Sequence, residues 1–590
     1  MGTKAPPSVT FVPKFGGGDT ARPDSPARSE WNRPPATYAG VVGTAGVSQW
    51  DVRLLARYAL PGFAGSLILA AGALGVGWLP LDGGVLDGSS LDPLRGTTAG
   101  LLLSRAFVFV GVALLLQAWL ILGHDLLAGR DDPHSLHGTD PRTLITVLVA
   151  WIAPLVLAPP LFSRDVYSYF AQGKVMAAGL DPYETGVAVI DGWFEDGVDP
   201  MWAETPTPYG PAWLLLARGV ATVTPEQPAL AALIFRLAAL AGLALLVIYV
   251  PRVASALGID PSAALWLGVL NPLVVMHVVS GAHNDALMAG LVVMGFALAL
   301  ERHPALGATA VALAGAVKPI ALLALPFIGL IWAGQARQGR LRRSGGQPDQ
   351  EPPVDSPGLA AGWPPRIRAW VLVALITVGV FAVASLVAGV GLGWLAALGT
   401  PGEVRTWLSP ATAVGMLLGW LTTAAGLTID DALVVTVVRA LGTLAALGII
   451  AWLVLRPEGR SPVRGAALAF LTVVLLGPVV QPWYLLWFLP LFAVSGLSPG
   501  QLRVTVIAIA GFSLHGMAES SSTSDNLFEF SDGLAIVAAF IVVGLVLLVS
   551  PRERRLVLGG PLSQGLRPES PDQRARASQS VFRGRIATRE

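Results

Sequence analysis

Long apolar stretches, separated by short polar connections, run through most of the chain. Apolar length alone predicts about 13 to 14 transmembrane helices. Two further apolar pieces, 211–224 and 411–428, are predicted to be amphipathic or re-entrant helices at one membrane face. The pattern predicts an all-α polytopic membrane protein. The expected spans are 58–80, 100–123, 142–162, 229–250, 261–281, 284–300, 305–317, 319–334, 370–392, 432–455, 464–480, 482–496, 503–518 and 532–550.

Two of these divisions rest on prolines that interrupt longer apolar runs. As a single helix, 305–334 would be about 45 Å long at ~1.5 Å per residue, whereas the hydrocarbon core is ~30 Å thick. Proline removes a backbone donor and clashes with the preceding turn, so a break is expected at Lys318-Pro319. The same argument predicts a break at Gln481-Pro482, inside 464–496.

Composition supports the membrane class. The 590 residues are 53% hydrophobic and only 13% charged, whereas a soluble domain carries about 25% charged residues. The chain has no cysteine, which excludes disulfides, thiol catalysis and cysteine metal clusters. Residues 1–50 are rich in Pro, Gly and Ser and are predicted to be a disordered cytoplasmic tail, followed by a transmembrane domain at 51–550.

Charge is distributed unevenly among the connections, and this distribution predicts the topology. Cytoplasmic loops are enriched in Lys and Arg. Loop 335–369 and tail 551–590 are rich in arginine, so both are expected to be cytoplasmic and disordered. Loop 163–228 is long and mostly acidic, and it is expected to lie outside, with short helices of its own.

A few strongly polar residues lie at the ends of apolar runs. They are Arg164, Asp165, His283, Asn284, Asp285, Lys318, Gln481, Trp483 and Tyr484. Structural alternatives exist: Asp165 could neutralise Arg164 at a helix end, Lys318 could extend to the interface, and Trp483 could belong to an aromatic belt. The predicted topology, however, puts all of them at the outer face, from four separate connections. This placement indicates one site, because ionisable residues in membrane segments are functional candidates by default.

Other motifs limit the kind of substrate. The sequence contains no Walker A loop, no GxGxxG between a strand and a helix, and no metal-binding histidine spacing. Any activated substrate would therefore have to arrive without a nucleotide-binding domain, for example on a lipid carrier in the bilayer. A transporter or flippase is the competing class, but its site usually lies near the midplane between inverted repeats. The sequence shows no convincing repeat.

Several motifs together resemble the polyprenol-phosphomannose-dependent α-1,6-mannosyltransferases of actinobacteria, within the type C glycosyltransferase superfamily. The resemblance covers roughly residues 50–550. It rests on APPLFSRDVYSYFAQG at 158–173, GLDPY at 179–183, TPYGP at 207–211, HNDALM at 283–288, AVKPIALL at 316–323 and VVQPWYLLW at 479–487. The superfamily's catalytic acidic residue in an early external loop corresponds to Asp165. The double-acid form of that motif is absent, because Arg164 precedes Asp165, so we assume no metal and no other cofactor.

The resemblance implies a polyprenyl-phosphate mannose donor, a mannan glycolipid acceptor of the lipomannan or lipoarabinomannan type, and inversion at the anomeric carbon. The enzyme would lie in the plasma (inner) membrane, in contact with lipid but not nucleic acid, with its active site on the extracytoplasmic face. Asp165 would be the base, with Lys318 and Arg164 on the phosphate. The sugar or acceptor pocket would contain Tyr167, His283, Asn284, Asp285, Gln481, Trp483 and Tyr484. A related transferase for arabinose or glucose is an alternative, because these motifs do not reveal sugar stereochemistry.

Overall fold

The protein is described here by a computed structural model that covers residues 55–80, 88–128, 136, 139–343, 362–402, 406–518 and 566. Over these residues the chain is helical, and the only β-pairing among them is an isolated bridge between Leu497 and Leu566. The predicted all-α class is therefore confirmed. The α-helices are α2 (Leu60–Val76), α3 (Pro93–Gly96), α4 (Thr98–Leu127), α5 (Pro141–Ile152), α6 (Asp165–Ala177), α7 (Pro211–Val223), α8 (Pro228–Ala256), α9 (Pro261–Gly268), α10 (Asp285–Leu300), α11 (Pro304–Val317), α12 (Leu325–Arg343), α13 (Trp363–Ala388), α14 (Pro410–Ala424), α15 (Asp431–Leu455), α16 (Pro462–Leu476), α17 (Leu485–Val494) and α18 (Pro499–Ala518).

Six helical segments in the described part are long and apolar enough to cross a membrane. They are Ala56–Val76, Thr98–Leu127, Pro228–Ala256, Pro319–Gly339, Trp363–Ala388 and Asp431–Leu455. A seventh span is possible where the π-helix η7 (Val274–Ser280) meets α10 at a 112° bend. The protein is thus a polytopic membrane protein. The predicted span 532–550 and both tails lie outside the described residues.

Prolines mark where many of these helices begin. A proline lies in the first turn of α5, α8, α9 and α16, namely Pro141, Pro228, Pro261 and Pro462. A backbone N–H at that position would have no acceptor within the helix, so proline costs no hydrogen bond there. Preceding side chains complete several of these ends. For example, Asp260 accepts a hydrogen bond from the Ala263 N–H at 2.7 Å.

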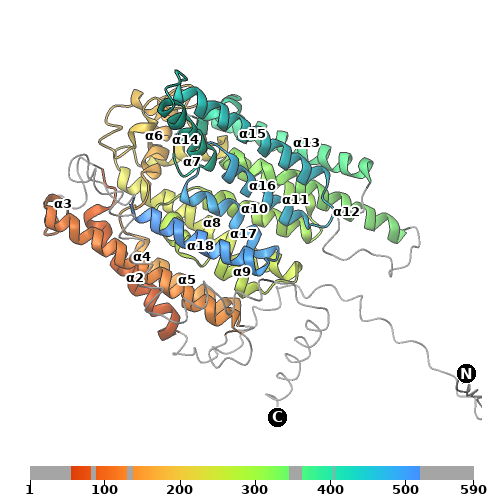
Figure 1. Cartoon of the computed structure of the whole chain (residues 1–590), viewed down its shortest axis with the longest axis horizontal. Coiled ribbons are helices and arrows are strands. Elements are labelled where there is room, and N and C mark those ends of the chain that lie inside the picture. Colours follow the sequence, from red (N-terminus) through yellow and green to blue (C-terminus); the bar gives the residue numbers. More distant parts are fainter. Residues whose placement is uncertain are drawn as a thin grey trace, which may run out of the picture. The chain divides into compact units, whose positions relative to one another are not determined.

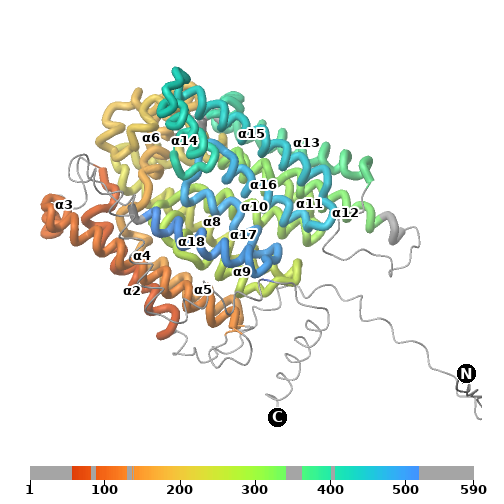
Figure 2. The backbone as a smooth tube through the Cα atoms, in the orientation of Figure 1, coloured from red at the N-terminus to blue at the C-terminus, as the bar shows by residue number. Residues whose placement is uncertain are grey.

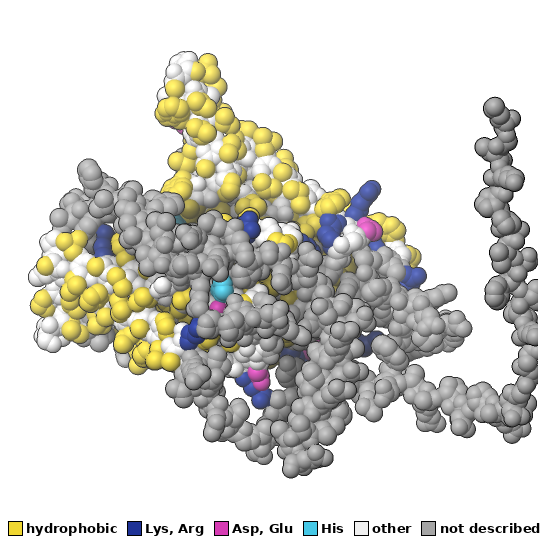
Figure 3. All heavy atoms as spheres, turned by 60° about the horizontal axis from the view of Figure 1, so that its bottom comes forward, with side chains coloured by type: hydrophobic (Ala, Val, Ile, Leu, Met, Phe, Trp, Pro, Cys, Tyr) yellow, Lys and Arg dark blue, Asp and Glu magenta, His cyan; other side chains and the backbone are white. Residues whose placement is uncertain are grey.

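Figure 1 shows α2, α4 and α5 grouped together, and α2 packs on both α4 and α5. The tube in Figure 2 follows the later helices, in which α12 packs on α13, and α15 packs on both α14 and α16. Helices α8, α10 and α11 form a further packed group. Large apolar side chains on α13 and α15 are exposed, and hydrophobic side chains cover much of the described surface visible in Figure 3. Such surface suits contact with lipid.

Both proline breaks are present. Helix α11 ends at Val317, Lys318 is extended (φ −143°, ψ 113°), and a 3₁₀ segment at Pro319–Ala324 leads into α12. Gln481 is likewise extended (φ −124°, ψ 151°) between α16 and the 3₁₀ turn Pro482–Tyr484. The ambiguous pieces form α7 and α14, whose 13 and 15 residues give lengths of about 20 Å, too short to cross a ~30 Å core alone.

Several boundaries differ from the sequence-based prediction; for example, the expected span 261–281 is interrupted between α9 and η7. The expected span 142–162 is helical only to Leu155, because Pro154, Pro159 and Pro160 prevent regular backbone hydrogen bonding beyond it. The expected loop 335–369 is shorter, since α12 extends to Arg343 and α13 begins at Trp363. Residues 344–361 of that loop lie outside the described residues.

Candidate active site

Asp165 is the first residue of α6, and the preceding turn aims its side chain. Phe162 has φ +69°, an uncommon conformation for a residue with a Cβ, and it turns the chain between the proline-rich segment and α6. The Asp165 N–H donates to Ser163 Oγ at 3.1 Å. A carboxylate in the first turn of a helix is stabilised by the unsatisfied backbone N–H groups there. The Asp165 side chain is 16% exposed and faces a cavity.

His283 supports Asp165 from another part of the chain. Its Nδ1 lies 3.4 Å from Asp165 Oδ2, a long contact rather than a short hydrogen bond. The imidazole is fully buried and stacks on Trp483, with ring centroids 3.9 Å apart and planes inclined by 21°. Ala282, just before it, has φ +54° in a buried position. Backbone strain of this kind persists only where the surrounding structure enforces it.

These contacts control the protonation of Asp165. Burial raises the pKa of the Asp165 carboxyl, but the imidazole of His283 and the charge of Lys318 outweigh burial and lower the pKa below its ordinary value. The indole of Trp202 also lowers it, although the indole N–H makes no hydrogen bond of good geometry. Asp165 is therefore a carboxylate near neutral pH and can accept a proton.

Lys318, at the first proline break, pairs with Asp285. The ammonium Nζ lies 2.8 and 2.9 Å from the two Asp285 oxygens. Trp487 Nε1 donates to the same carboxylate at 2.5 Å, so the buried charge of Asp285 is well compensated. Lys318 also lies 5.4 Å from the ring centre of Tyr484 and 5.5 Å from that of Trp487, within cation–π range.

Arg236, within α8, fixes the two chain segments that carry the carboxylates. Its guanidinium donates to the carbonyls of Val156 and Ala158 at 2.8 and 2.7 Å, ahead of Asp165. It also donates to the Ser280 carbonyl at 3.2 Å, ahead of His283. Arg236 therefore binds backbone carbonyls that are left without helical partners where helices end.

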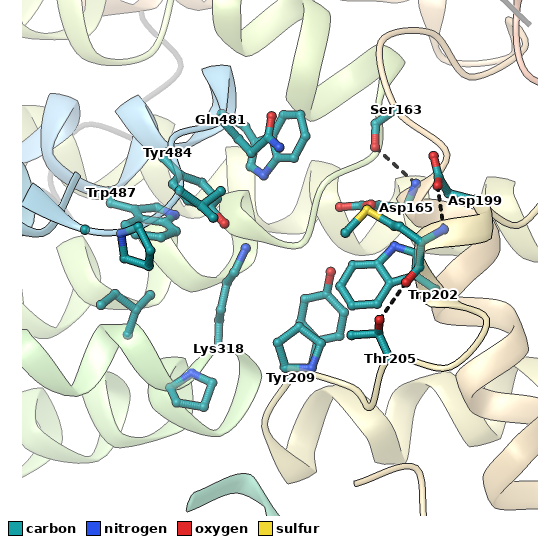
Figure 4. A pocket seen from close by; sticks show the side chains of 18 of the residues that line it. Ser163, Asp165, Asp199, Trp202, Thr205, Tyr209, Lys318, Gln481, Tyr484 and Trp487 are labelled. Carbon is teal, nitrogen blue, oxygen red and sulfur yellow. Dashed lines mark hydrogen bonds between the residues drawn. The ribbon is translucent and has the colours of Figure 1, made fainter. Parts of the chain in front are cut away.

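A cavity of about 680 Å³ lies between these elements. Figure 4 shows Lys318, Gln481, Tyr484 and Trp487 on one side, and Asp165, Asp199, Trp202 and Thr205 on the other. The lining continues into an apolar part that includes Ile320, Leu398, Val473 and Val479. The cavity lining is thus partly polar and partly apolar.

The structure brings the candidate residues together in two layers. Asp165, Arg164, Lys318, Gln481, Trp483 and Tyr484 line the cavity. His283, Asn284 and Asp285 are fully buried and are not among the lining residues. His283 and Asp285 act on the cavity through Asp165 and Lys318, while the backbone N–H of Asn284 lies 3.5 Å from the hydroxyl of Tyr169.

Tyr167 does not line the cavity, contrary to the expected pocket position. Its hydroxyl donates to the Trp78 carbonyl at 2.8 Å, and the side chain is 1% exposed. Tyr167 follows Asp165 by two residues on one helix, and residues at that spacing do not face the same side.

Arg164 lines the cavity beside Asp165. Its guanidinium carbon lies 4.8 Å from the ring centre of Trp78 and 5.8 Å from that of Phe194. Its Nε donates to the Gly197 carbonyl at 2.7 Å, where Gly197 has φ +97°, a conformation suited to glycine. Arg164 is therefore held by loop 163–228 rather than by Asp165.

Sequence reasoning missed several lining residues. Trp487 lies three residues after Tyr484, and their rings stack at 3.9 Å. Helical spacing from Tyr484 could have indicated it. Tyr209 belongs to the TPYGP motif, and burial raises the pKa of its phenol well above the ordinary value, so it stays a neutral hydroxyl. Asp199, Met201, Trp202 and Thr205 come from a stretch of loop that contains a short 3₁₀ turn at Pro200–Trp202 and carries no periodic signal. Within the described ranges, no group of three or more His, Cys, Asp or Glu side chains is placed to bind a metal ion.

Comparison with known proteins gives a consistent result. Residues 59–334 match the family model described as "Alpha-(1->6)-mannopyranosyltransferase, N-terminal domain", and residues 411–549 match the "MptB C-terminal domain" model. The matched regions contain all of the cavity-lining candidates named in the sequence. No solved structure shows significant similarity to the chain.

Curated relatives extend the match to most of the chain. An alpha-(1->6)-mannopyranosyltransferase A of Mycobacterium tuberculosis is 35% identical over 505 residues, covering 85% of this chain and 92% of the relative. The protein of the same name from Corynebacterium glutamicum is 32% identical over 424 residues, covering 71% of this chain and 84% of the relative. On this similarity, the chain belongs to the actinobacterial α-(1→6)-mannopyranosyltransferase family.

Proposed function

We propose that the protein is an inverting mannosyltransferase that uses polyprenyl-phosphate mannose to form α-1,6-mannosidic linkages on a mannan glycolipid. The observation that carries this proposal is that Asp165 and Lys318 face one cavity from opposite sides, and that apolar side chains also line this cavity. The names of the relatives support mannosyl transfer with α-(1→6) linkage.

Asp165 is the proposed general base. Its lowered pKa keeps it ionised, and its position at the cavity surface allows contact with an acceptor hydroxyl. A phosphate leaving group needs little protonation, so one carboxylate base is enough. In an inverting displacement, the base and the leaving group lie on opposite faces of the sugar.

Lys318 is the proposed phosphate-binding cation, on the opposite side of the cavity from Asp165. Phosphate approaching Lys318 would be stabilised electrostatically in a site partly shielded from water. Asp285 holds the ammonium in place with two short contacts, so its orientation is set before substrate binds. Arg164 is a second candidate for the phosphate, because its guanidinium lines the same cavity, where it also interacts electrostatically with Asp199.

The apolar part of the cavity supports a lipid-linked donor. Leu398, Val473 and Val479 offer hydrocarbon contacts close to α15, which exposes much of its own apolar surface. A polyprenyl chain could pass from the bilayer along this side while its phosphate reaches Lys318. The site would face the outside of the plasma membrane, since arginine-rich segments at 335–369 and 551–590 favour the cytoplasm.

The direct test is transfer by the purified full-length protein in lipid nanodiscs. We expect labelled polyprenyl-phosphate mannose and a short α-1,6-mannoside acceptor to give a product cleaved by an α-1,6-specific mannosidase. Polyprenyl-phosphate arabinose and glucose serve as matched donors. Preferential transfer from one of these donors would reject mannose as the substrate, and no transfer from any of them would reject the lipid-phosphate donor class.

A further inference from the structure

We propose that Trp202 and Asp199 bind the acceptor sugar. Both residues belong to one wall of the cavity, which residues 199–205 form. This inference rests on the proposed function and specifies where its second substrate binds. The ligand is the terminal mannose of a neutral, hydroxyl-rich oligosaccharide. Nothing in the sequence motifs pointed to this wall.

The geometry of the reaction predicts that the acceptor lies against this wall. Figure 4 shows Asp199, Trp202 and Thr205 on the same side of the cavity as Asp165, with Lys318, Gln481 and Tyr484 on the other side. The nucleophile and the leaving group must approach the anomeric carbon from opposite directions. If the phosphate is near Lys318, the acceptor lies on the side of Asp165, against residues 199–205.

Trp202 has a donor close to Asp165 at this position. Its side chain is 7% exposed and lines the cavity, and its indole N–H interacts with the Asp165 carboxylate but makes no hydrogen bond of good geometry. A buried polar group without a good hydrogen bond is unfavourable, so such a group in a binding cavity is suited to a ligand. The effect of Trp202 on the pKa of Asp165 indicates that its indole is near the base. A hydroxyl held by Trp202 would therefore be close to Asp165.

Asp199 provides a complementary acceptor. Its Oδ1 accepts a hydrogen bond from the Met201 N–H at 2.9 Å. A carboxylate has two oxygens and several lone pairs, so Asp199 retains capacity to accept from sugar hydroxyls. An indole ring and a carboxylate together suit a sugar, which presents apolar C–H faces and hydroxyl donors.

Hydrogen bonds within the loop hold this wall in place, so it can orient the bound acceptor sugar. The backbone N–H of Trp202 donates to the Asp199 carbonyl at 3.0 Å, and the Thr205 side-chain hydroxyl donates to the Met201 carbonyl at 2.6 Å. The Ala188 N–H donates to the Ala203 carbonyl at 2.9 Å, tying the wall to an earlier part of the loop. Fixed binding groups position a hydroxyl for reaction more effectively than mobile ones.

Steady-state kinetics of Trp202→Phe test the proposal. This change removes the N–H and keeps an aromatic ring, and we expect the acceptor KM to rise roughly tenfold, the usual effect of losing one hydrogen bond. The donor KM should be unchanged. Asp199→Asn should act in the same direction, because the amide oxygen can still accept from Met201 while the negative charge is lost.

Trp213→Phe is the matched control. The Trp213 indole N–H is also buried without a good hydrogen bond, but Trp213 packs against Tyr169 and Phe235 and does not line the cavity. Its acceptor KM should equal that of the wild type. The proposal is wrong if Trp202→Phe raises the donor KM instead, if it changes neither constant, or if Trp213→Phe has the same effect.

A binding measurement separates this proposal from the proposed function. Saturation-transfer NMR with α-1,6-mannobiose, without any donor, should show sugar contacts in the wild type and Trp213→Phe, and weaker contacts in Trp202→Phe. Mannobiose binding that depends on Trp202, in a protein inactive with polyprenyl-phosphate mannose, would overturn the donor and leave the acceptor site standing. Mannobiose binding independent of Trp202 would overturn the acceptor site even in an active enzyme.

Discussion

The imidazole of His283 lies 3.4 Å from the carboxylate of Asp165 while its ring stacks on Trp483. We therefore propose His283 as a positioning residue for the proposed base, held by Trp483, which follows the second proline break. We expect His283→Gln to raise the pKa of Asp165, because burial alone raises it. Asp165 acts as a base only when ionised, so kcat/KM should fall on the order of tenfold at pH 5 and little at pH 8. The pH–rate profile checks this, and an unchanged acid limb would contradict it.

Replacement of Asp165 tests the base directly. Asp165→Asn keeps the shape of the side chain but cannot accept a proton, so kcat should fall by about 10² to 10⁴. Asp165→Glu should also be impaired, because misplacement by ~1 Å can cost ~10²-fold. Asp196→Asn is a suitable control, since Asp196 pairs with Lys174 at 2.9 Å and does not line the cavity. Near-normal transfer by purified Asp165→Asn would remove it from the mechanism.

The Lys318–Asp285 pair calls for a double mutant. Lys318→Met leaves the buried Asp285 charge without its cation, with only the Trp487 hydrogen bond remaining, and breaking a buried ion pair typically costs ~3–5 kcal/mol of stability. Adding Asp285→Asn removes that charge, so thermal stability should largely recover. The donor KM should remain above that of the wild type, because the proposed phosphate-binding cation is still missing. Lys318→Arg should keep partial activity, because a cation remains in a different geometry. If the double mutant regains both stability and donor affinity, Lys318 has only a structural role.

Topology is testable because the protein has no cysteine of its own. A cysteine replacing the exposed Glu195 should react with an impermeant thiol reagent in intact cells. A cysteine at Ser344 should react only after the membrane is permeabilised. The reverse labelling pattern would place the active site on the cytoplasmic side.

The sequence predicted the features that depend on local chemistry. Pro319 and Pro482 marked the two breaks because proline cannot continue a helix. The convergence of Asp165, His283 and Lys318 followed from their shared position at the ends of apolar segments. These short-range signals were sufficient to identify most of the polar lining of the cavity.

Other features depend on contacts between distant residues and could not be read from the sequence. His283 and Asp285 were expected at the cavity surface, but they lie beneath it because Asp165 and Lys318 cover them. Asp199 and Trp202 are placed by an irregular loop whose path is set by scattered hydrogen bonds. The orientation of Tyr167, by contrast, was available from helical spacing once α6 was known to begin at Asp165.

The two helix breaks also determine how water meets the donor. Non-helical backbone at membrane depth is tolerated where it is buried in protein or borders a water-filled space, and both Lys318 and Gln481 line the cavity. If Asp165 is the base, as proposed, water that enters this cavity before the acceptor would give up a proton to Asp165 as a sugar hydroxyl would. A donor that binds first is exposed to slow hydrolysis, whereas an acceptor that binds first displaces the competing nucleophile. On the proposed mechanism, the order in which the two substrates bind therefore determines what fraction of the donor is hydrolysed instead of transferred.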